Sequence, residues 1–243
     1  MSDRRLRNRV LHLRPDPLIQ PRRTPILLSD SKGFYLKEEV SINPETFIQF
    51  WCTSGATAED QLNYLQQNLE AQIDIYENIT LFVWVGTCNL TKKTTDGYIE
   101  ITSKDNSAAY TLIETLKQVY HFVRQFGSSV KLVFIQVPIY SITHYNKYKN
   151  HQNPDTFTEQ DFLLRQQIDI VNQYIDDTNR ILHSYSPHLS QDLLKSKRNS
   201  IFSVRTKYSY NFNLYKDGIH PKPLLAKLWL ARFCRLVHDF CYD

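Results

Sequence analysis

Asp217 and His220 lie three residues apart in the segment KDGIHP, and this spacing suits acid–base chemistry. A serine hydroxyl is a poor nucleophile unless a base such as histidine takes its proton. An aspartate close to that histidine can hold the imidazole in the required tautomer and stabilise the imidazolium. The short spacing lets one turn before a helix carry both groups. The plainer interpretations are a turn aspartate before glycine and a histidine that faces solvent or caps a helix.

A second candidate is the segment TPILLSDSKGFY at residues 24–35, where an apolar run ends in small polar residues. Such a strand either turns at the surface or delivers a side chain to a site. Only six glycines occur, and four of them follow or end an apolar run or lie beside an acid: Gly33, Gly55, Gly86 and Gly218. Because ligands bind at the carboxyl ends of parallel strands, we expect these segments to converge at one edge of a sheet.

The elements that would position these residues alternate along the chain. Apolar runs predict strands at residues 25–29, 47–52, 79–85 and 130–138, with a weaker one at 200–204. The runs are continuous, which is typical of parallel strands covered on both faces. Helical periodicity occupies residues 59–71, 107–126, 158–182 and 221–240. The alternation predicts an α/β fold, a three-layer α/β/α sandwich with a mostly parallel, flavodoxin-like sheet.

Composition limits the class of protein. The 243 residues are 42% hydrophobic, enough for a substantial core, and the net charge is only +4. Residues 1–23 contain seven arginines and two aspartates, and we expect a flexible basic tail ahead of one domain at residues 24–243. That tail offers contact with nucleic acid or anionic membrane. The remainder is nearly neutral, which argues against a dedicated DNA-binding domain.

The cellular setting is predicted from what the chain contains. No apolar run approaches the ~20 residues needed to span a bilayer, and no signal-peptide pattern is present. The four cysteines show no disulfide framework and no paired spacing, which predicts reduced thiols. The other histidines show no metal-ligand spacing. We therefore expect an intracellular, cytoplasmic protein without a metal.

Four short segments carry a resemblance to a known family. In chain order they are LLSDSKG (27–33), SGATAED (54–60), VGTCNLT (85–91) and KDGIHP (216–221). They resemble the four sequence blocks of the SGNH, or GDSL-like, hydrolases, and the resemblance extends from about residue 24 to the end. It implies a flavodoxin-like sandwich that hydrolyses esters of lipids, acetylated sugars or small acyl groups, with no cofactor.

The resemblance also implies a role for each matched residue. Ser31 is the nucleophile, His220 the base and Asp217 the partner of that base. The backbone N–H groups of Ser31 and Gly55 become oxyanion donors, each worth about 3 kcal/mol. Ser29 stands where the family usually has glycine. Ser31 as an ordinary turn serine and Gly55 as a simple loop residue remain the alternatives.

The third oxyanion donor departs from the family pattern. The family has Gly-x-Asn-Asp, whereas this chain reads Gly86-Thr87-Cys88-Asn89. Cys88 therefore occupies the asparagine position, and a thiol is a weak donor. Asn89 takes the role only if the turn is shifted by one residue. We expect the donor to be Asn89 or Cys88.

The sequence thus predicts a serine esterase or deacylase that acts through an acyl-enzyme on a small-molecule, lipid or carbohydrate ester. The altered third block keeps an alternative open, a weak or inactive binding or scaffolding domain of the same fold. The GTC and DGIHP segments are similar to those of esterase-like proteins encoded by mobile genetic elements. Together with the basic tail, this similarity suggests that the domain is associated with nucleic acid or membrane. The polar, aromatic segment 140–153 is either a cover over the substrate or an exposed connection.

Overall fold

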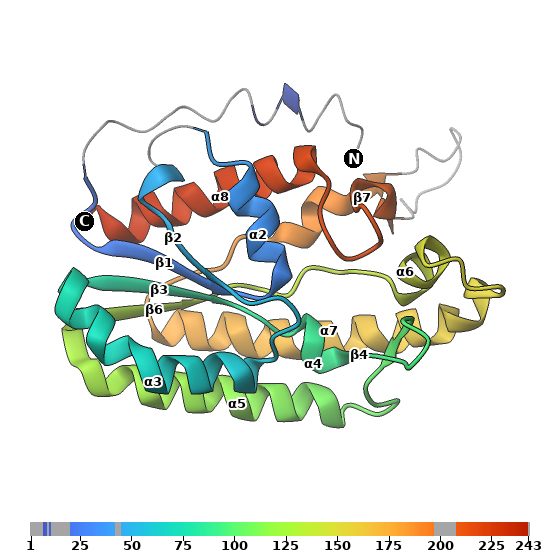
Figure 1. Cartoon of the computed structure of the whole chain (residues 1–243), viewed down its shortest axis with the longest axis horizontal. Helices are drawn as coiled ribbons and strands as arrows, with labels where there is room; N and C mark the ends of the chain where they lie inside the picture. The colour runs from blue at the N-terminus through green and yellow to red at the C-terminus, as the bar shows by residue number, and fades with distance from the viewer. Residues whose placement is uncertain (1–6, 9, 11–19, 42–44, 197–207, 243) are drawn as a thin grey trace, which may run out of the picture.

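Four parallel strands form the central sheet, and each corresponds to one of the apolar runs in the sequence. Their order across the sheet is β2-β1-β3-β6. The strands are β1 (Thr24–Ser29), β2 (Gln49–Cys52), β3 (Ile79–Trp84) and β6 (Val130–Phe134). All residues of β3 are buried, because helices cover both faces of the sheet (Figure 1). In this computed structural model the predicted three-layer sandwich is confirmed.

The structure describes residues 7–8, 10, 20–41, 45–196 and 208–242. The predicted strand at 200–204 and most of the predicted tail at 1–23 lie outside the described residues. The division of the chain at residue 24 stays a prediction. Within the described ranges, no helix combines the length and the apolar character needed to cross a bilayer.

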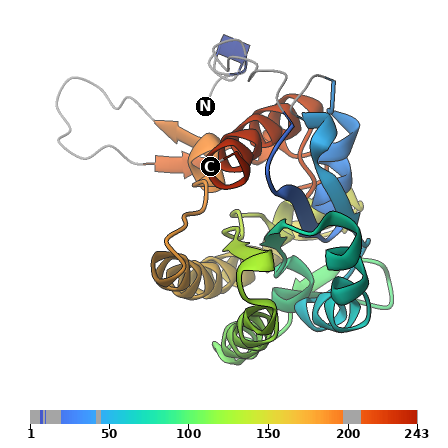
Figure 2. The same ribbon diagram turned by 90° about the vertical axis from the view of Figure 1, so that its left-hand side faces the viewer.

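Two groups of long helices sandwich the sheet. In Figure 1, α2 and α8 lie above it, and α3, α5 and α7 lie below; Figure 2 shows the same layers from one end of the molecule. The bounds are α2 (Ser31–Glu38), α3 (Ala58–Tyr76), α5 (Ser107–Val123), α7 (Thr158–Ile181) and α8 (Pro223–Cys241). The core is made where these helices meet the strands, as in the edge-to-face contact of Trp84 on β3 with Trp229 on α8.

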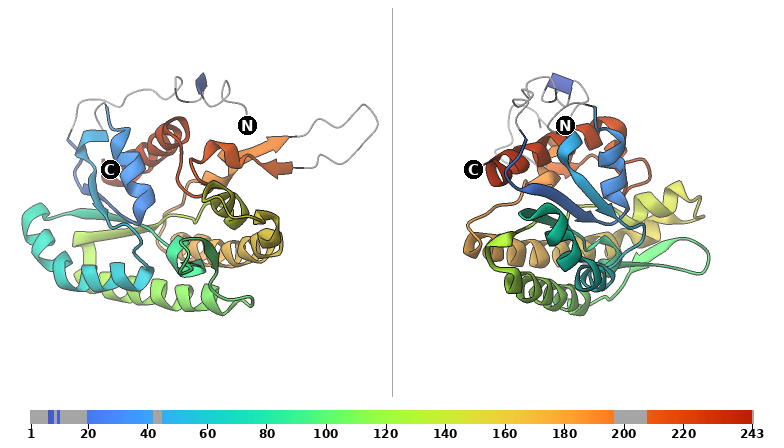
Figure 3. Two further views of the ribbon diagram at one scale, coloured as in Figure 1. Left: turned by 45° about the vertical axis from the view of Figure 1, so that its right-hand side comes forward. Right: turned by 60° about the vertical axis from the view of Figure 1, so that its left-hand side comes forward.

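Short elements gather beyond the carboxyl ends of the strands, on the right of Figure 1. They are α4 (Thr87–Leu90), α6 (Ile142–Tyr148) and the hairpin of β4 (Thr91–Lys93) with β5 (Ile99–Ile101). A second hairpin, β7 (Leu194–Ser196) with β8 (Tyr208–Tyr210), extends away from the sheet in Figure 3. Short 3₁₀ helices lie at Glu45–Phe47, Arg124–Ser129, Pro154–Phe157, Leu189–Leu193 and Phe212–Leu214.

The structure departs from the sequence expectation in the segment 140–153. Its centre is the helix α6, and Ser141 caps that helix by accepting a hydrogen bond from the His144 amide at 3.1 Å. Ser141 and Ile142 are fully buried, and Asp161 of α7 accepts hydrogen bonds from both. The interpretation of this segment as an exposed connection is therefore wrong for its first half.

Candidate active site

Ser31 lies at the carboxyl end of β1, where the chain changes from strand to helix within one residue. β1 ends at Ser29 and α2 begins at Ser31, so that Asp30 is the N-cap. The Asp30 side chain accepts a hydrogen bond from the Lys32 amide at 2.9 Å, as N-cap carboxylates do. The amide of Ser31 belongs to the first turn of α2, where N–H groups have no acceptor within the helix. This amide is therefore available to a developing negative charge.

Gly33 allows α2 to approach the sheet closely. A Cβ at this position would lie 2.3 Å from Cys52 Sγ on β2 and 2.9 Å from Ser29 Cβ on β1. Both distances are far below van der Waals contact, so a side chain has no room there. Gly33 is part of the helix, and its role is this close approach.

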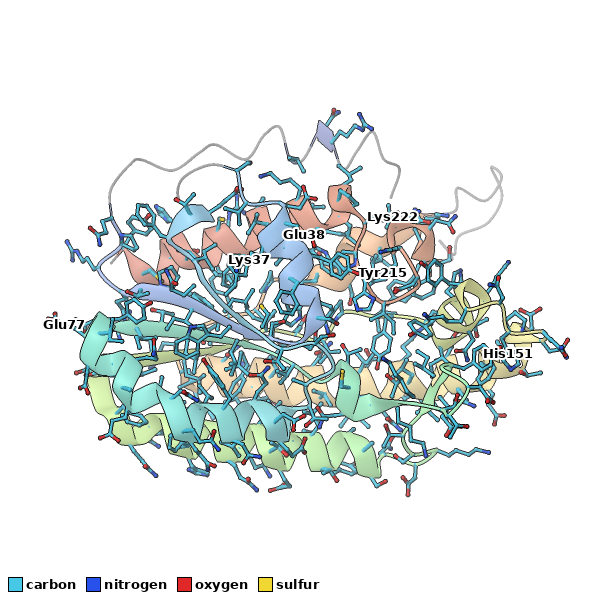
Figure 4. The ribbon with its side chains drawn as sticks, viewed as in Figure 1. Lys37, Glu38, Glu77, His151, Tyr215 and Lys222 are labelled. Carbon is cyan, nitrogen blue, oxygen red and sulfur yellow. The ribbon has the colours of Figure 1, made fainter. Side chains whose placement is uncertain are left out.

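Asp217 and His220 are carried by a short loop closed on itself at its base. Lys216 donates its amide hydrogen to His220 O at 2.7 Å, and Tyr215 and Pro221 form an antiparallel bridge. Within the loop, Asp217 Oδ1 accepts from the amides of Ile219 and His220, at 3.0 and 2.9 Å. This Asx-type turn fixes the carboxylate against the backbone of the histidine that it faces. In Figure 4, Tyr215 and Lys222 mark the two sides of this loop, beside α2.

Gly218 presses the same loop against α6. Its φ is +97°, and a Cβ there would lie 2.8 Å from the Tyr145 amide nitrogen and 2.9 Å from His144 Cβ. The Ser141 amide donates to Gly218 O at 3.1 Å. The segment 140–153 therefore supports the loop that carries the histidine, a contact that the sequence did not reveal.

The loop brings His220 to Ser31 across 189 positions of sequence. Ser31 Oγ lies 2.9 Å from His220 Nε2, and His220 Nδ1 lies 2.6 Å from Asp217 Oδ2. The Tyr35 ring from α2 packs beside the imidazole, with centroids 5.0 Å apart and planes inclined by 32°. The histidine side chain is 20% exposed and that of the aspartate 9%. A hydroxyl, an imidazole and a carboxylate thus form a continuous hydrogen-bonded chain with one end open to solvent.

The carboxylate of Asp217 is held in its ionised form. Burial by itself raises its pKa, but the hydrogen bond and charge of His220 and the two backbone amides lower it by more, so that the net pKa lies below the ordinary value. The anion can therefore fix the Nδ1 proton of the imidazole, which leaves Nε2 free to accept from Ser31.

Gly55 lies in a turn next to the carboxyl end of β1. The Ala56 amide donates to Thr53 O at 3.3 Å and the Thr53 amide to Ser29 O at 3.0 Å, so the turn is tied to β1. Gly55 has a φ of +77°, which favours glycine in the third position of a turn. Nothing lies within 4 Å of a Cβ built on this residue. The conformation, and not the space, requires glycine here.

Asn89 is engaged with α3. Its Oδ1 accepts from the Ala58 amide at 2.9 Å, and its Nδ2 donates to Glu59 Oε2 at 2.7 Å. Thr115 on α5 donates to the other oxygen of Glu59 at 2.8 Å. The carboxamide therefore caps the first turn of α3 from a separate segment, and one of its two amide hydrogens is already donated.

Cys88 is half-buried in the turn at residues 86–89. Burial is the main cause that raises the pKa of its thiol, and the negative charge of Asp30 raises it further while Lys32 lowers it. The thiol therefore stays protonated at neutral pH and is a weak hydrogen-bond donor.

No group of three or more histidine, cysteine or carboxylate side chains that could hold a metal ion occurs among the residues that the structure describes. The sequence reasoning missed Tyr35 and Lys32, which flank the serine on α2. Tyr35 carried no signal, because an aromatic residue two positions after a glycine has many ordinary roles. Lys32 carried one, because a lysine only three residues after a buried strand must either enter the core or turn back to the surface.

Comparison with known proteins places the fold. No protein-family model matches the sequence, and no curated protein matches it. Among solved structures, a lipase/acylhydrolase from Enterococcus faecalis is 15% identical with a TM-score of 0.55, covering 90% of this chain and 97% of its own. A putative acylhydrolase from Bacteroides fragilis has 9% identity, a TM-score of 0.61 and coverages of 97% and 95%. A GDSL-like lipase from Bacteroides thetaiotaomicron has 12% identity, a TM-score of 0.59 and 98% coverage of both chains.

These identities are low, and the likeness concerns the course of the backbone alone. It extends over nearly the whole of each chain, which agrees with the four blocks found in the sequence. The chain has the fold of the SGNH, or GDSL-like, hydrolases.

Proposed function

We propose that this protein is a serine esterase or deacylase in which Ser31 is the nucleophile, His220 the base and Asp217 the residue that orients the base. One observation carries the proposal: Ser31 Oγ is 2.9 Å from His220 Nε2, while the other ring nitrogen is 2.6 Å from Asp217 Oδ2. This is the arrangement in which a histidine can take the hydroxyl proton as a bond to carbon forms.

The first half of the reaction makes an acyl-enzyme. Ser31 Oγ attacks the ester carbonyl carbon, and its proton passes to His220 Nε2. The carbonyl π electrons move to oxygen, and the amides of Ser31 and Gly55 are the proposed donors to that oxyanion. The tetrahedral intermediate collapses, the C–O bond to the alcohol breaks, and His220 returns the proton to the leaving alkoxide.

The second half consumes one water. His220 Nε2 accepts a proton from the water while its oxygen attacks the acyl carbon. Collapse of this second intermediate breaks the bond to Ser31 Oγ, which regains a proton from His220 and releases the carboxylic acid. Asp217 keeps its charge throughout and stabilises the imidazolium in both halves.

The test combines a covalent probe with a substrate. The full-length protein and Ser31→Ala are treated with a fluorophosphonate probe and assayed with p-nitrophenyl acetate. We expect Ser31-dependent labelling and a loss of at least 10³-fold in kcat for the variant. A folded parent protein that neither labels nor turns over more substrate than Ser31→Ala would overturn the proposal.

The altered third block favours one second candidate, a binding domain of the same fold without catalysis. Cys88 stands where the family has a carboxamide, and Asn89 is engaged with α3. The same experiment separates the two candidates, because a binding domain does not require a reactive hydroxyl. A parent protein that Ser31-specific probes never label favours the binding domain.

A further inference from the structure

The residue that follows the proposed nucleophile is a buried cation. Lys32 is 2% exposed and Asp30, on the other side of Ser31, is 1% exposed. The Lys32 ammonium donates to Asp30 Oδ2 and to Thr87 Oγ1. It also lies over the Trp84 ring, 5.3 Å from the centroid. Lysine is almost never fully buried unless it is paired, and here it is paired with the residue next to the nucleophile.

This cation connects two of the four sequence blocks. Asp30 caps α2, while Thr87 begins α4 in the altered third block. Thr87 O in turn accepts from Tyr140 Oη at 3.1 Å and from Thr91 Oγ1 at 2.9 Å. The ammonium group therefore fixes the position of the turn at residues 86–89 relative to Ser31, a tie between two segments more than fifty positions apart.

The charge has a consequence for the chemistry. Asp30 is a buried carboxylate adjacent in sequence to the serine, and an unpaired anion there would repel an oxyanion that develops on the substrate. Across about 6 Å, at an effective dielectric of about 20, such a repulsion slows the reaction on the order of 100-fold. Lys32 pairs with Asp30 directly, and the same ammonium group donates to Thr87, the residue before Cys88.

We propose that Lys32 is a positioning residue for the proposed hydrolysis: its ammonium group neutralises Asp30 beside the nucleophile and, through Thr87, holds the third-block turn, so that the site tolerates an oxyanion without a carboxamide at position 88. The inference rests on the proposed serine-esterase function. In this role Lys32 removes a repulsion from the site and does not itself donate a hydrogen bond to the oxyanion.

The test compares two variants that break the same ion pair in opposite ways. Lys32→Met keeps the length of the side chain and leaves an unpaired anion, whereas Asp30→Asn keeps an N-cap side chain and leaves an unpaired cation. With p-nitrophenyl acetate we expect kcat to fall about 100-fold in Lys32→Met with KM unchanged within about threefold. We expect Asp30→Asn to keep kcat at or above the parental value, because the unpaired cation that it leaves attracts the oxyanion. The double variant, which carries both Lys32→Met and Asp30→Asn, should have a kcat at least tenfold higher than that of Lys32→Met alone.

A purely structural ion pair would give a different pattern, because either single variant would then cost a similar amount of activity. Lys227→Met is the matched control, since Lys227 pairs with the buried Glu45 near the other end of α2. We expect it to keep the parental kcat. Equal losses in Lys32→Met and Asp30→Asn, or a parental kcat in Lys32→Met, would overturn the proposal.

Fluorophosphonate labelling keeps the two proposals apart. If the parent protein labels at Ser31 and Lys32→Met labels at the same rate, only the role of Lys32 is refuted. If the parent itself does not label, the esterase function fails and the role of Lys32 fails with it. Should Lys32→Met not fold, Asp30→Asn and the double variant decide, because the charge argument requires kcat in Asp30→Asn to be at or above the parental value and higher than in the double variant.

Discussion

Replacement of Asp217 by asparagine is the most exacting test of the proposed mechanism, because it changes one atom in a side chain whose every contact is known. Oδ1 accepts from two backbone amides, at 3.0 and 2.9 Å, and Oδ2 accepts from His220 Nδ1 at 2.6 Å. An asparagine offers only one oxygen to these three donors. In the variant, the single oxygen can therefore accept either from the two backbone amides or from His220 Nδ1, but not from both.

The favoured orientation of that carboxamide is the inactive one. If its oxygen serves the two amides, its NH₂ faces Nδ1 and moves the imidazole proton to Nε2, where it blocks acceptance from Ser31. The reverse orientation abandons two buried hydrogen bonds, worth together about 2 kcal/mol or more. The productive orientation is thus disfavoured by roughly 30-fold.

The lost charge adds a second factor. The carboxylate stabilises the imidazolium that forms when His220 takes the proton. Two unit charges about 4 Å apart, at an effective dielectric of about 20, interact by roughly 4 kcal/mol, or nearly 10³-fold in rate. The two factors together predict a loss of about 10⁴-fold in kcat, similar to that seen when a serine-protease triad loses its carboxylate.

The assay measures kcat and KM for p-nitrophenyl acetate in the parent protein and in Asp217→Asn, with thermal unfolding to show that both are folded. Asp192→Asn is the matched control. Asp192 is also a buried carboxylate, bound at two points by Arg232 at 2.6 Å, but it lies outside the site. We expect it to lower stability and to leave kcat unchanged. A kcat for folded Asp217→Asn within tenfold of the parent would refute the assigned role.

Three further outcomes are expected. Gly33→Ala should lower the free energy of unfolding, measured in urea, by about 1–3 kcal/mol because of the clash with Cys52 Sγ. Adding Cys52→Ala to the same chain should restore part of that stability. An unchanged free energy of unfolding in Gly33→Ala would contradict the close approach of α2 to the sheet. Cys88→Asn should raise kcat up to about 100-fold by supplying a carboxamide, with Cys88→Ala unchanged as its control, and a lower kcat would count against the assignment of that position. The free energy of unfolding should be lower in Asp217→Asn than in the parent above about pH 4, where the ionised carboxylate stabilises the parent. This difference should shrink as the pH falls through the lowered pKa of Asp217, which urea titrations at pH 7 and pH 3 can check.

The strands were the most predictable part of this fold. β1 and β3 are continuous apolar runs that are buried on both faces, so composition alone locates them to within one or two residues. The run at 130–138 was extended too far, because the strand β6 ends at Phe134. From Gln136 onward the backbone amides pair with side chains, as when the Val137 amide donates to Asn172 on α7 at 2.8 Å. An apolar pattern does not distinguish a buried segment whose backbone pairs with a neighbouring strand from one whose backbone pairs with side chains.

Three α-helices escaped prediction: α4 is a single turn, and the buried faces of α2 and α6 include polar residues. In α6, Asn146 is fully buried, and its carboxamide pairs with the backbone of Ile99 as a strand would. Its Oδ1 accepts from the Ile99 amide and its Nδ2 donates to the Ile99 carbonyl, both at 2.8 Å. In α2, two of the buried residues are Lys32 and Gly33, which a hydrophobic pattern assigns to a loop. Periodicity finds a helix only where the buried side is apolar.

The site itself was predicted from short motifs, and its geometry depends on what those motifs could not show. The spacing of Asp217 and His220 indicated a pair, but α6 against Gly218 sets the position of that pair. Buried polar groups that break local sequence rules are expected to concentrate at functional sites, where their cost is offset by what they position. Asp30 and Lys32 break the rule on both sides of one serine, and Lys32 also donates to Thr87 in the altered third block. That coincidence is difficult to explain by stability, because a buried ion pair is often no more stable than a well-packed apolar pair. A requirement of the proposed chemistry at Ser31 explains it directly.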